Sequence, residues 1–227
     1  GRTLDEALLL AQEGVPIAVI WVLNTSAGAD ALLAKPGITT LDALRGKRLG
    51  VEQTAVGGYM LNAALAQAHL QVSDIRVVPL PLDEHWPAWQ ANTIDAVVTF
   101  DPVRQKILNA GGQVVFSSAD IPGQIVDVLV ARQSALECCR AQIERLMAGQ
   151  QQALTYLREH PTPAWQHMAQ RQGITPQELG QALAGIDTPD ARMNHTLLTQ
   201  ADTGLAATAQ YLATVMQTSR LLPSPPN

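Results

Sequence analysis

The chain has 227 residues, of which 47% are hydrophobic and 15% are charged, with 15 Lys plus Arg against 20 Asp plus Glu. A chain of this length can bury a large core and forms one or two domains of ordinary size. The formal net charge of −5 comes without any cluster of basic residues, which argues against a nucleic-acid partner and against attraction to an anionic membrane surface.

Targeting signals and cysteines give little information about the compartment. The longest apolar run, residues 15–23, contains Pro16 and is about half as long as a membrane-spanning helix. The first six residues have neither the basic start nor the apolar core of a secretory signal, so the protein is cytosolic or its true N-terminus lies upstream. Cys138 and Cys139 are adjacent, which does not suit an ordinary disulfide framework or a zinc site, and we interpret them as partly buried thiols.

The first part of the chain predicts a helix, two strands and a short capped helix. Apolar residues recur at intervals of three and four over residues 4–13, and Gly14 with Pro16 ends that pattern. Residues 15–23 read as a buried strand and residues 31–34 as another extended stretch. A short helix follows at residues 40–44 and ends at Gly46.

The middle of the chain alternates apolar strands with helices. The predicted strands are residues 48–52, 75–80, 95–100, 113–116 and 125–131. The predicted helices are residues 58–68, 83–91 and 102–109. This alternation indicates an α/β domain with a mostly parallel sheet that is covered on both faces.

From Ser134 onward the sequence predicts helices and no further strand. The predicted helices are residues 134–159, 163–172, 175–184 and 197–218. The third begins at Thr175-Pro176-Gln177-Glu178, a capping box with Pro in the first turn.

Five landmarks in a fixed order carry a resemblance to a known family. They are Leu4-Asp5-Glu6-Ala7 before Glu13-Gly14-Val15-Pro16, then Ser26 to Ala34, Leu44 to Glu52, Ile94 to Val97, and Asp101-Pro102. The chain thereby resembles the periplasmic solute-binding proteins of ABC importers for nitrate, taurine and alkanesulfonates, and their relatives that bind thiamine-pyrimidine precursors.

The resemblance implies a type II periplasmic binding fold, with two lobes and a helical C-terminal part. Lobe one would comprise residues 1–43 and 123–227, and lobe two residues 44–122. The family has a further strand-helix-strand-helix block upstream, so we expect lobe one to be incomplete here. Without that block, residues 15–23 and 128–131 would lack pairing partners, and the chain would bind its ligand poorly and form dimers.

The loop of residues 53–59 follows a strand and opens a helix, which is where open α/β sheets bind ligands. Its candidate ligand-binding residues are Thr54, Ala55, Val56, Gly57 and Tyr59. Small residues let a ligand approach the backbone, and the helix start suits an anionic or polar group. The alternative is an ordinary loop in which Gly serves tight packing.

Five further candidates for ligand binding lie outside that loop. They are Ser26, Gly28 and Asp30 after the first buried strand, Asp101 after the strand at residues 95–100, and Asp5 at the start of the first helix. Asp30 and Asp101 are equally suited to capping backbone amides. Because residues 26–30 and 53–59 contain no Arg or Lys, recognition by them would depend on hydroxyl groups, amides and the helix end.

The sequence lacks the motifs of hydrolases, P-loop proteins and zinc proteases, and its five histidines show no ligand spacing, so we interpret them as surface residues. No metal or cofactor is expected. Together with the resemblance, this predicts a non-enzymatic substrate-binding component of an ABC transporter, located in the periplasm and delivering a small solute to an inner-membrane permease. The alternatives are an enzyme of the same fold in thiamine or menaquinone precursor synthesis, and a periplasmic sensor domain of a signalling protein.

Overall fold

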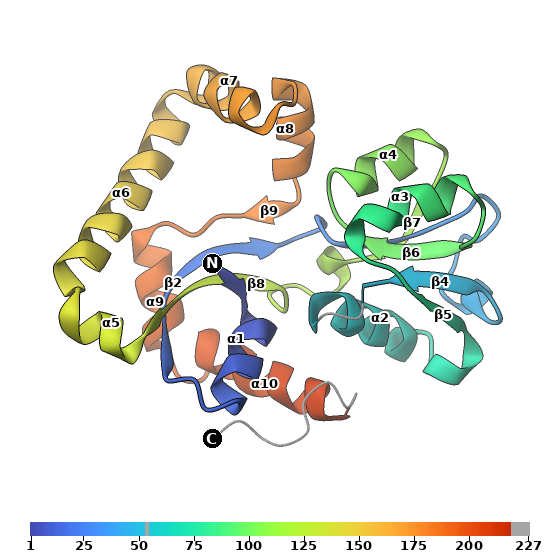
Figure 1. Ribbon diagram of the computed structural model, residues 1–227, viewed down its shortest axis with the longest axis horizontal. Coiled ribbons are helices and arrows are strands. Elements are labelled where there is room, and N and C mark those ends of the chain that lie inside the picture. Colours follow the sequence, from blue (N-terminus) through green and yellow to red (C-terminus); the bar gives the residue numbers. More distant parts are fainter. Residues whose placement is uncertain (53–54, 219–227) are drawn as a thin grey trace. The chain divides into compact units, whose positions relative to one another are not determined.

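The computed structural model describes residues 1–52 and 55–218 and contains two compact units (Figure 1). Unit 1 comprises Gly1–Thr25 and Val126–Gln217, and unit 2 comprises Ser26–Ile125. Residues 26–43, which the sequence assigned to lobe one, therefore lie in unit 2. The reason is that the strand at residues 31–34 is hydrogen-bonded on both sides within the sheet of unit 2.

The sheet of unit 1 has the strand order β1 (Arg2–Thr3), β8 (Val126–Arg132), β2 (Ile17–Ser26) and β9 (Ile186–Asp187). Strand β8 pairs antiparallel with β1 on one side and with β2 on the other. The two long strands, expected to lack partners, thus pair with each other from Ile17↔Arg132 to Thr25↔Val126. Since β1 and β9 have only two residues each, the two long strands form most of this sheet. The expected dimer stays a prediction.

The helices of unit 1 are α1 (Leu4–Gln12), α5 (Gln133–Cys138), α6 (Arg140–Glu159), α7 (Pro161–Gln172), α8 (Pro176–Leu183), α9 (Ala191–Thr199) and α10 (Leu205–Thr218). Helix α8 begins at the predicted capping box, where the Thr175 hydroxyl accepts a hydrogen bond from the Glu178 amide. The single helix expected at residues 197–218 is two helices. Asp190 caps the first of them by accepting a hydrogen bond from the Met193 amide, which starts α9 earlier than expected.

The cysteine pair differs from its predicted state. Cys138 and Cys139 form a disulfide with each other, so the interpretation as free thiols was wrong. The helix expected over residues 134–159 is broken at the same place, because Cys139 has φ −134° and ψ 27° and separates α5 from α6.

The sheet of unit 2 has the strand order β5 (Arg76–Pro79), β4 (Arg48–Val51), β6 (Ala96–Thr99), β3 (Ala31–Ala34) and β7 (Gln113–Ser117). Its helices are α2 (Ala55–Gln67), α3 (Leu82–Gln90) and α4 (Val103–Asn109), with short 3₁₀ turns at Asp42–Leu44, Val72–Asp74 and Ser118–Asp120. Strand β4 is parallel to β5 and β6, whereas β3 is antiparallel to β6 and β7. The α/β class is confirmed, but parallel pairing is limited to β5, β4 and β6, because β3 enters this sheet in the opposite direction.

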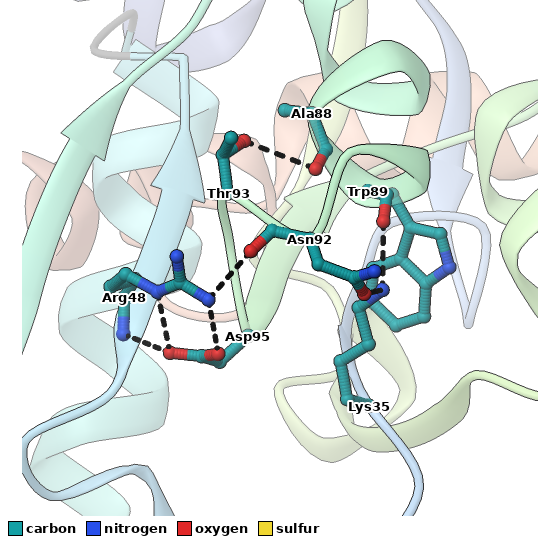
Figure 2. A network of polar contacts seen from close by, with 7 residues as sticks. All are labelled: Lys35, Arg48, Ala88, Trp89, Asn92, Thr93 and Asp95. Carbon is teal, nitrogen blue, oxygen red and sulfur yellow. Dashed lines mark hydrogen bonds and ion pairs between the residues drawn. The ribbon is translucent and has the colours of Figure 1, made fainter.

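A polar network fixes one edge of this sheet, where β4 and β6 begin and β3 ends (Figure 2). The Arg48 guanidinium donates to both carboxylate oxygens of Asp95, at 3.1 Å and 2.8 Å. These hydrogen bonds hold the pKa of the Asp95 carboxyl below its ordinary value. The Lys35 ammonium donates to the Trp89 carbonyl at 2.7 Å and lies 4.4 Å from the centre of the Trp89 ring. The network therefore ties α3 to the strand ends.

Asn194 bridges α9 to β2 and supplies our first prediction. Its side-chain oxygen accepts from the Val22 amide at 2.7 Å, and its nitrogen donates to the Val22 carbonyl at 3.0 Å. Both residues are buried, so Asn194→Ala leaves two backbone groups of β2 without partners. We expect a loss of about 2 to 4 kcal/mol in the unfolding free energy of unit 1. Urea denaturation and hydrogen exchange at the Val22 amide measure this loss.

The matched control is Gln166→Ala, which removes an exposed amide side chain from α7 of the same unit. It should leave both measurements unchanged. Full retention of Val22 amide protection in Asn194→Ala would contradict the bridging role.

Candidate functional site

The strand register of unit 2 brings several loops to one edge of its sheet, opposite the Arg48 network. Strands β4 and β6 run parallel, so the loops after Val51 and Thr99 leave at the same edge. Ala31, the first residue of β3, pairs with Thr99 on one side and with Ser117, the last residue of β7, on the other. The segment before β3 and the segment after β7 therefore lie at this edge too. We call this side of the sheet, where the strands end at Val51, Thr99 and Ser117 and β3 begins at Ala31, the candidate edge.

Ser26, Gly28 and Asp30 form a turn that is closed by Ser118, a buried residue that the sequence did not single out. The hydroxyl oxygens of Ser26 and Ser118 lie 2.7 Å apart, and the Gly28 amide donates to the Ser118 hydroxyl at 2.6 Å. The Asp30 amide donates to the Ser26 hydroxyl at 3.2 Å, and the Asp30 carbonyl accepts from the Ser118 amide at 2.9 Å. Both serines thus stabilise the turn.

Helix α2 begins at the candidate edge, directly after β4. Thr54, one of the predicted ligand-binding residues, lies outside the described residues, and Ala55 is the first residue of α2. A Cβ atom on Gly57 would lie 2.2 Å from the Glu52 carbonyl oxygen, so this glycine allows close packing of the helix on the preceding loop. Val56 is half-buried. The first-turn amides of α2 carry the positive end of the helix dipole, which favours an anionic or polar group.

Tyr59 is a core residue with a polar end. Tyr59 is 2% exposed, and its hydroxyl donates to the side-chain oxygen of Gln124. Gln124 follows the 3₁₀ turn after β7. This contact joins α2 to the segment that returns from the candidate edge. The position of the Tyr59 ring therefore depends on packing within unit 2.

Asp101 caps the start of α4, as its capping interpretation proposed. One of its carboxylate oxygens accepts from the Gln105 amide at 3.2 Å. The other lies 3.8 Å from the guanidinium of Arg104, a half-buried residue whose Nε has no hydrogen-bond partner. Arg104 is thus a cation close to the candidate edge. The sequence pattern did not point to Arg104, because this residue lies in a helix, outside the loops at residues 26–30 and 53–59.

His85 is a histidine that the sequence analysis wrongly assigned to the surface. It is 1% exposed, whereas the other four histidines are exposed as expected. Its Nδ1 lies 3.1 Å from the Thr99 hydroxyl and its Nε2 lies 3.3 Å from the Leu80 carbonyl oxygen. Burial lowers the pKa of the His85 imidazole, so the neutral ring holds Thr99 at the end of β6. A residue that the sequence assigned to the surface therefore supports the candidate edge.

Asp5 lies in unit 1, in the first turn of α1. Asp5 is 4% exposed, and its Oδ2 has no hydrogen-bond partner. Burial raises the pKa of the Asp5 carboxyl. Position in the first turn explains a carboxylate here, but an unpartnered buried oxygen is costly and is typical of groups kept for recognition.

Within residues 1–52 and 55–218, no helix is long and apolar enough to cross a membrane. No group of three or more His, Cys, Asp or Glu side chains in the same residues is placed to hold a metal ion.

Residues 3–164 match the profile of the NMT1/THI5 like family. The chain belongs to this family. A protein of Brucella abortus (strain 2308), named only as a candidate binding protein, is 27% identical over 86 residues, or 38% of this chain. The matched stretch spans 27% of that relative's length.

Solved structures with the same fold include two sulfonate-binding proteins. The alkanesulfonate-binding protein SsuA from Xanthomonas axonopodis pv. citri, bound to MOPS, has a TM-score of 0.78 and 18% identity, over 98% of this chain and 75% of that chain. The periplasmic aliphatic sulphonate binding protein SsuA from Escherichia coli also has a TM-score of 0.78, with 20% identity over 98% and 70% of the two chains. These similarities confirm the expected fold class.

The same fold also occurs in an enzyme. The desulfurization enzyme DSZB has a TM-score of 0.70 and 14% identity, over 98% of this chain and 79% of that chain. The fold alone therefore does not separate binding proteins from enzymes.

Ser118 at the candidate edge yields the second prediction. Ser118→Ala removes the acceptor of the Gly28 amide and the partner of the Ser26 hydroxyl, and both serines are buried. We expect a loss of about 1 to 3 kcal/mol in the unfolding free energy of unit 2. Chemical denaturation measures it, with Ser73→Ala as the control, because Ser73 is an exposed serine of the same unit. Equal stability of the two variants would show that the serine pair does not hold the turn.

Asp5 yields the third prediction, in which removal of a charge stabilises the protein. The pKa of the Asp5 carboxyl is raised above its ordinary value of 3.8 in the folded state, so the folded state retains this proton longer than the unfolded state does. The contribution of Asp5 to stability is thus complete below pH 3.8 and is lost as the pH rises through the folded pKa. Asp5→Asn should therefore be more stable than the unsubstituted protein at pH 7, by about 1 to 3 kcal/mol.

Unfolding free energies measured at pH 4 and pH 7 test this prediction, because the advantage of Asp5→Asn should grow with pH. Asp202→Asn, at an exposed position of unit 1, controls for the change in net charge. A pH-independent difference between Asp5→Asn and the unsubstituted protein would contradict it.

Proposed function

We propose that this protein is the solute-binding component of an ABC importer, which captures a small anionic or polar solute in the periplasm and delivers it to an inner-membrane permease. One observation carries the proposal. The register of unit 2 places the start of α2, the first turn of α4 with Arg104, and the Ser26–Asp30 turn at one edge of one sheet. Such an edge, outside the carboxyl ends of parallel strands, is the usual place for a ligand in open α/β sheets.

The groups at the candidate edge suit a sulfonate or a similar oxyanion. A helix N-terminus offers backbone amides and the positive dipole end, and a guanidinium adds hydrogen-bond donors and charge. Arg104 Nε is a buried donor without a partner. The two SsuA relatives, whose names state that they bind alkanesulfonates or aliphatic sulphonates, share the fold and support the same ligand class.

The alternative of an enzyme is supported by the DSZB likeness, but the polar groups of the candidate edge fit binding better. A serine nucleophile needs a neighbouring general base. The two buried serines, Ser26 and Ser118, are hydrogen-bonded to each other and to backbone amides. His85, the buried imidazole of unit 2, lies against Thr99 and the Leu80 carbonyl.

The fourth prediction tests the proposal by placing a negative charge at the start of α2. The ligand probes are ethanesulfonate and MOPS, titrated calorimetrically and by the rise in melting temperature that binding to the native state produces. Ala55→Asp should fold normally, because a helix N-terminus favours an acidic residue, yet it should repel the sulfonate. We expect the affinity to fall about tenfold or more, which corresponds to at least about 1.4 kcal/mol.

Ala55→Ser is the matched control, since it adds a polar side chain of similar size without charge. It should bind the probes as the unsubstituted protein does. Saturable binding that Ala55→Asp leaves unchanged would remove the start of α2 from the site, and release of sulfite or another product from a bound sulfonate would identify an enzyme. Absence of saturable binding for both probes would contradict the proposed ligand class.

A further inference from the structure

Helices α5 and α6 meet at an angle, and the junction is the disulfide between two adjacent cysteines (Figure 1). Cys138 is the last residue of α5, and Cys139 is the single residue between the helices, with non-helical dihedral angles. Cys138 is exposed and Cys139 is half-buried, so the disulfide can be reached from solvent. Nothing in the proposed solute site uses this pair.

A disulfide between adjacent residues is incompatible with a continuous α-helix. A disulfide needs Cβ atoms about 3.5 to 4.5 Å apart. Successive residues of an α-helix are turned by 100° about the axis, which separates their Cβ atoms by about 5 Å or more. The bond and the helix therefore exclude each other at Cys139, and the chain has to leave the helical conformation there.

The sequence around the junction favours one uninterrupted helix. Its apolar residues recur at helical spacing on both sides of the cysteines, at Leu136, Ile143, Leu146 and Met147, and no Pro or Gly lies between Gln133 and Met147. The break instead gives α6 a new N-terminus, at which the first amides have no partner inside the helix. Closing the break would let the amides of Arg140 and Ala141 pair with the carbonyl groups of Leu136 and Glu137, whereas the Gln142 amide already donates to the Cys139 carbonyl at 3.0 Å.

We propose that Cys138 and Cys139 form a reversible redox site that controls whether α5 and α6 are two helices or one. A dithiol reductant supplies two electrons and two protons. The sulfur–sulfur bond breaks, each sulfur becomes a thiol, and the dithiol is oxidised to its own disulfide. The reduced segment, residues 133–159, then forms a continuous helix. Reoxidation returns the electrons to an acceptor disulfide and restores the break.

The consequence of the switch falls on an apolar groove of unit 1 that spans the junction. Its walls include Ala135 and Cys138 on the α5 side, Ile143 and Leu146 on the α6 side, and Ile20 and Leu129 of the sheet. Because the two helices supply separate parts of the lining, a change in their relative direction changes the shape of the groove. The redox state of the pair therefore decides how much apolar surface unit 1 exposes there.

The test is hydrogen exchange followed by mass spectrometry on the full chain, with and without dithiothreitol. Reduction should slow the exchange of the Arg140 and Ala141 amides about tenfold or more, because these two amides gain helical partners. The double variant Cys138→Ser/Cys139→Ser should show the slow exchange under both conditions. Serine is a weaker helix former than alanine, so its slow exchange could not be attributed to helix propensity.

Two controls separate the switch from a general effect of the reductant. Amides of α8, which contains no cysteine, should exchange at the same rate in both conditions. An apolar fluorescent dye should bind the reduced protein and the double serine variant equally, and the oxidised protein differently. Unchanged exchange at residues 140 and 141 on reduction would overturn the proposal, as would two reactive thiols in protein that has never been reduced. Neither result bears on sulfonate binding, so the two proposals can fail independently.

Discussion

The backbone groups of β3 must all be paired within a sheet, because this strand is shielded from water along its whole length. Its four residues have no exposed surface, and an unpaired buried amide or carbonyl is costly. Strand β3 meets the requirement by lying between β6 and β7, antiparallel to both. That position brings the turn before β3 beside the end of β6 and the end of β7. The candidate edge exists because β3 is placed in this way.

The polar groups at the two edges of the sheet in unit 2 consequently differ in how fully they are paired. At one edge, Arg48 forms an ion pair with Asp95, and Lys35 donates a hydrogen bond to the Trp89 carbonyl (Figure 2). These contacts fix the ends of three strands. At the other edge, Arg104 keeps a buried donor without a partner, and α2 presents its N-terminus. Charged groups at the first edge are fully paired, whereas at the second edge Arg104, which lies 3.8 Å from the Asp101 carboxylate, keeps one donor without a partner.

Unit 1 shows the same contrast between satisfied and unsatisfied polar groups. Asn194 fills the backbone hydrogen bonds of Val22 on β2, so this buried amide is structural. Asp5 retains an oxygen without a partner in an equally buried place. An oxygen buried without a partner lowers stability, so Asp5 and Asn194 have opposite effects on the stability of unit 1.

Local patterns in the sequence determined the order and type of most elements, because helix caps, apolar periodicity and turn residues act over a few positions. The capping box at Thr175 and the alternation from β4 to β7 are examples. Only the tertiary structure decided which unit β3 joins, that His85 is buried, and that Arg104 lies near the candidate edge. The cysteine pair is the sharpest case, since apolar spacing predicts one helix and a covalent bond divides it. Such features depend on contacts between residues far apart in the chain or on covalent chemistry. The apolar periodicity of the sequence contains no information about either.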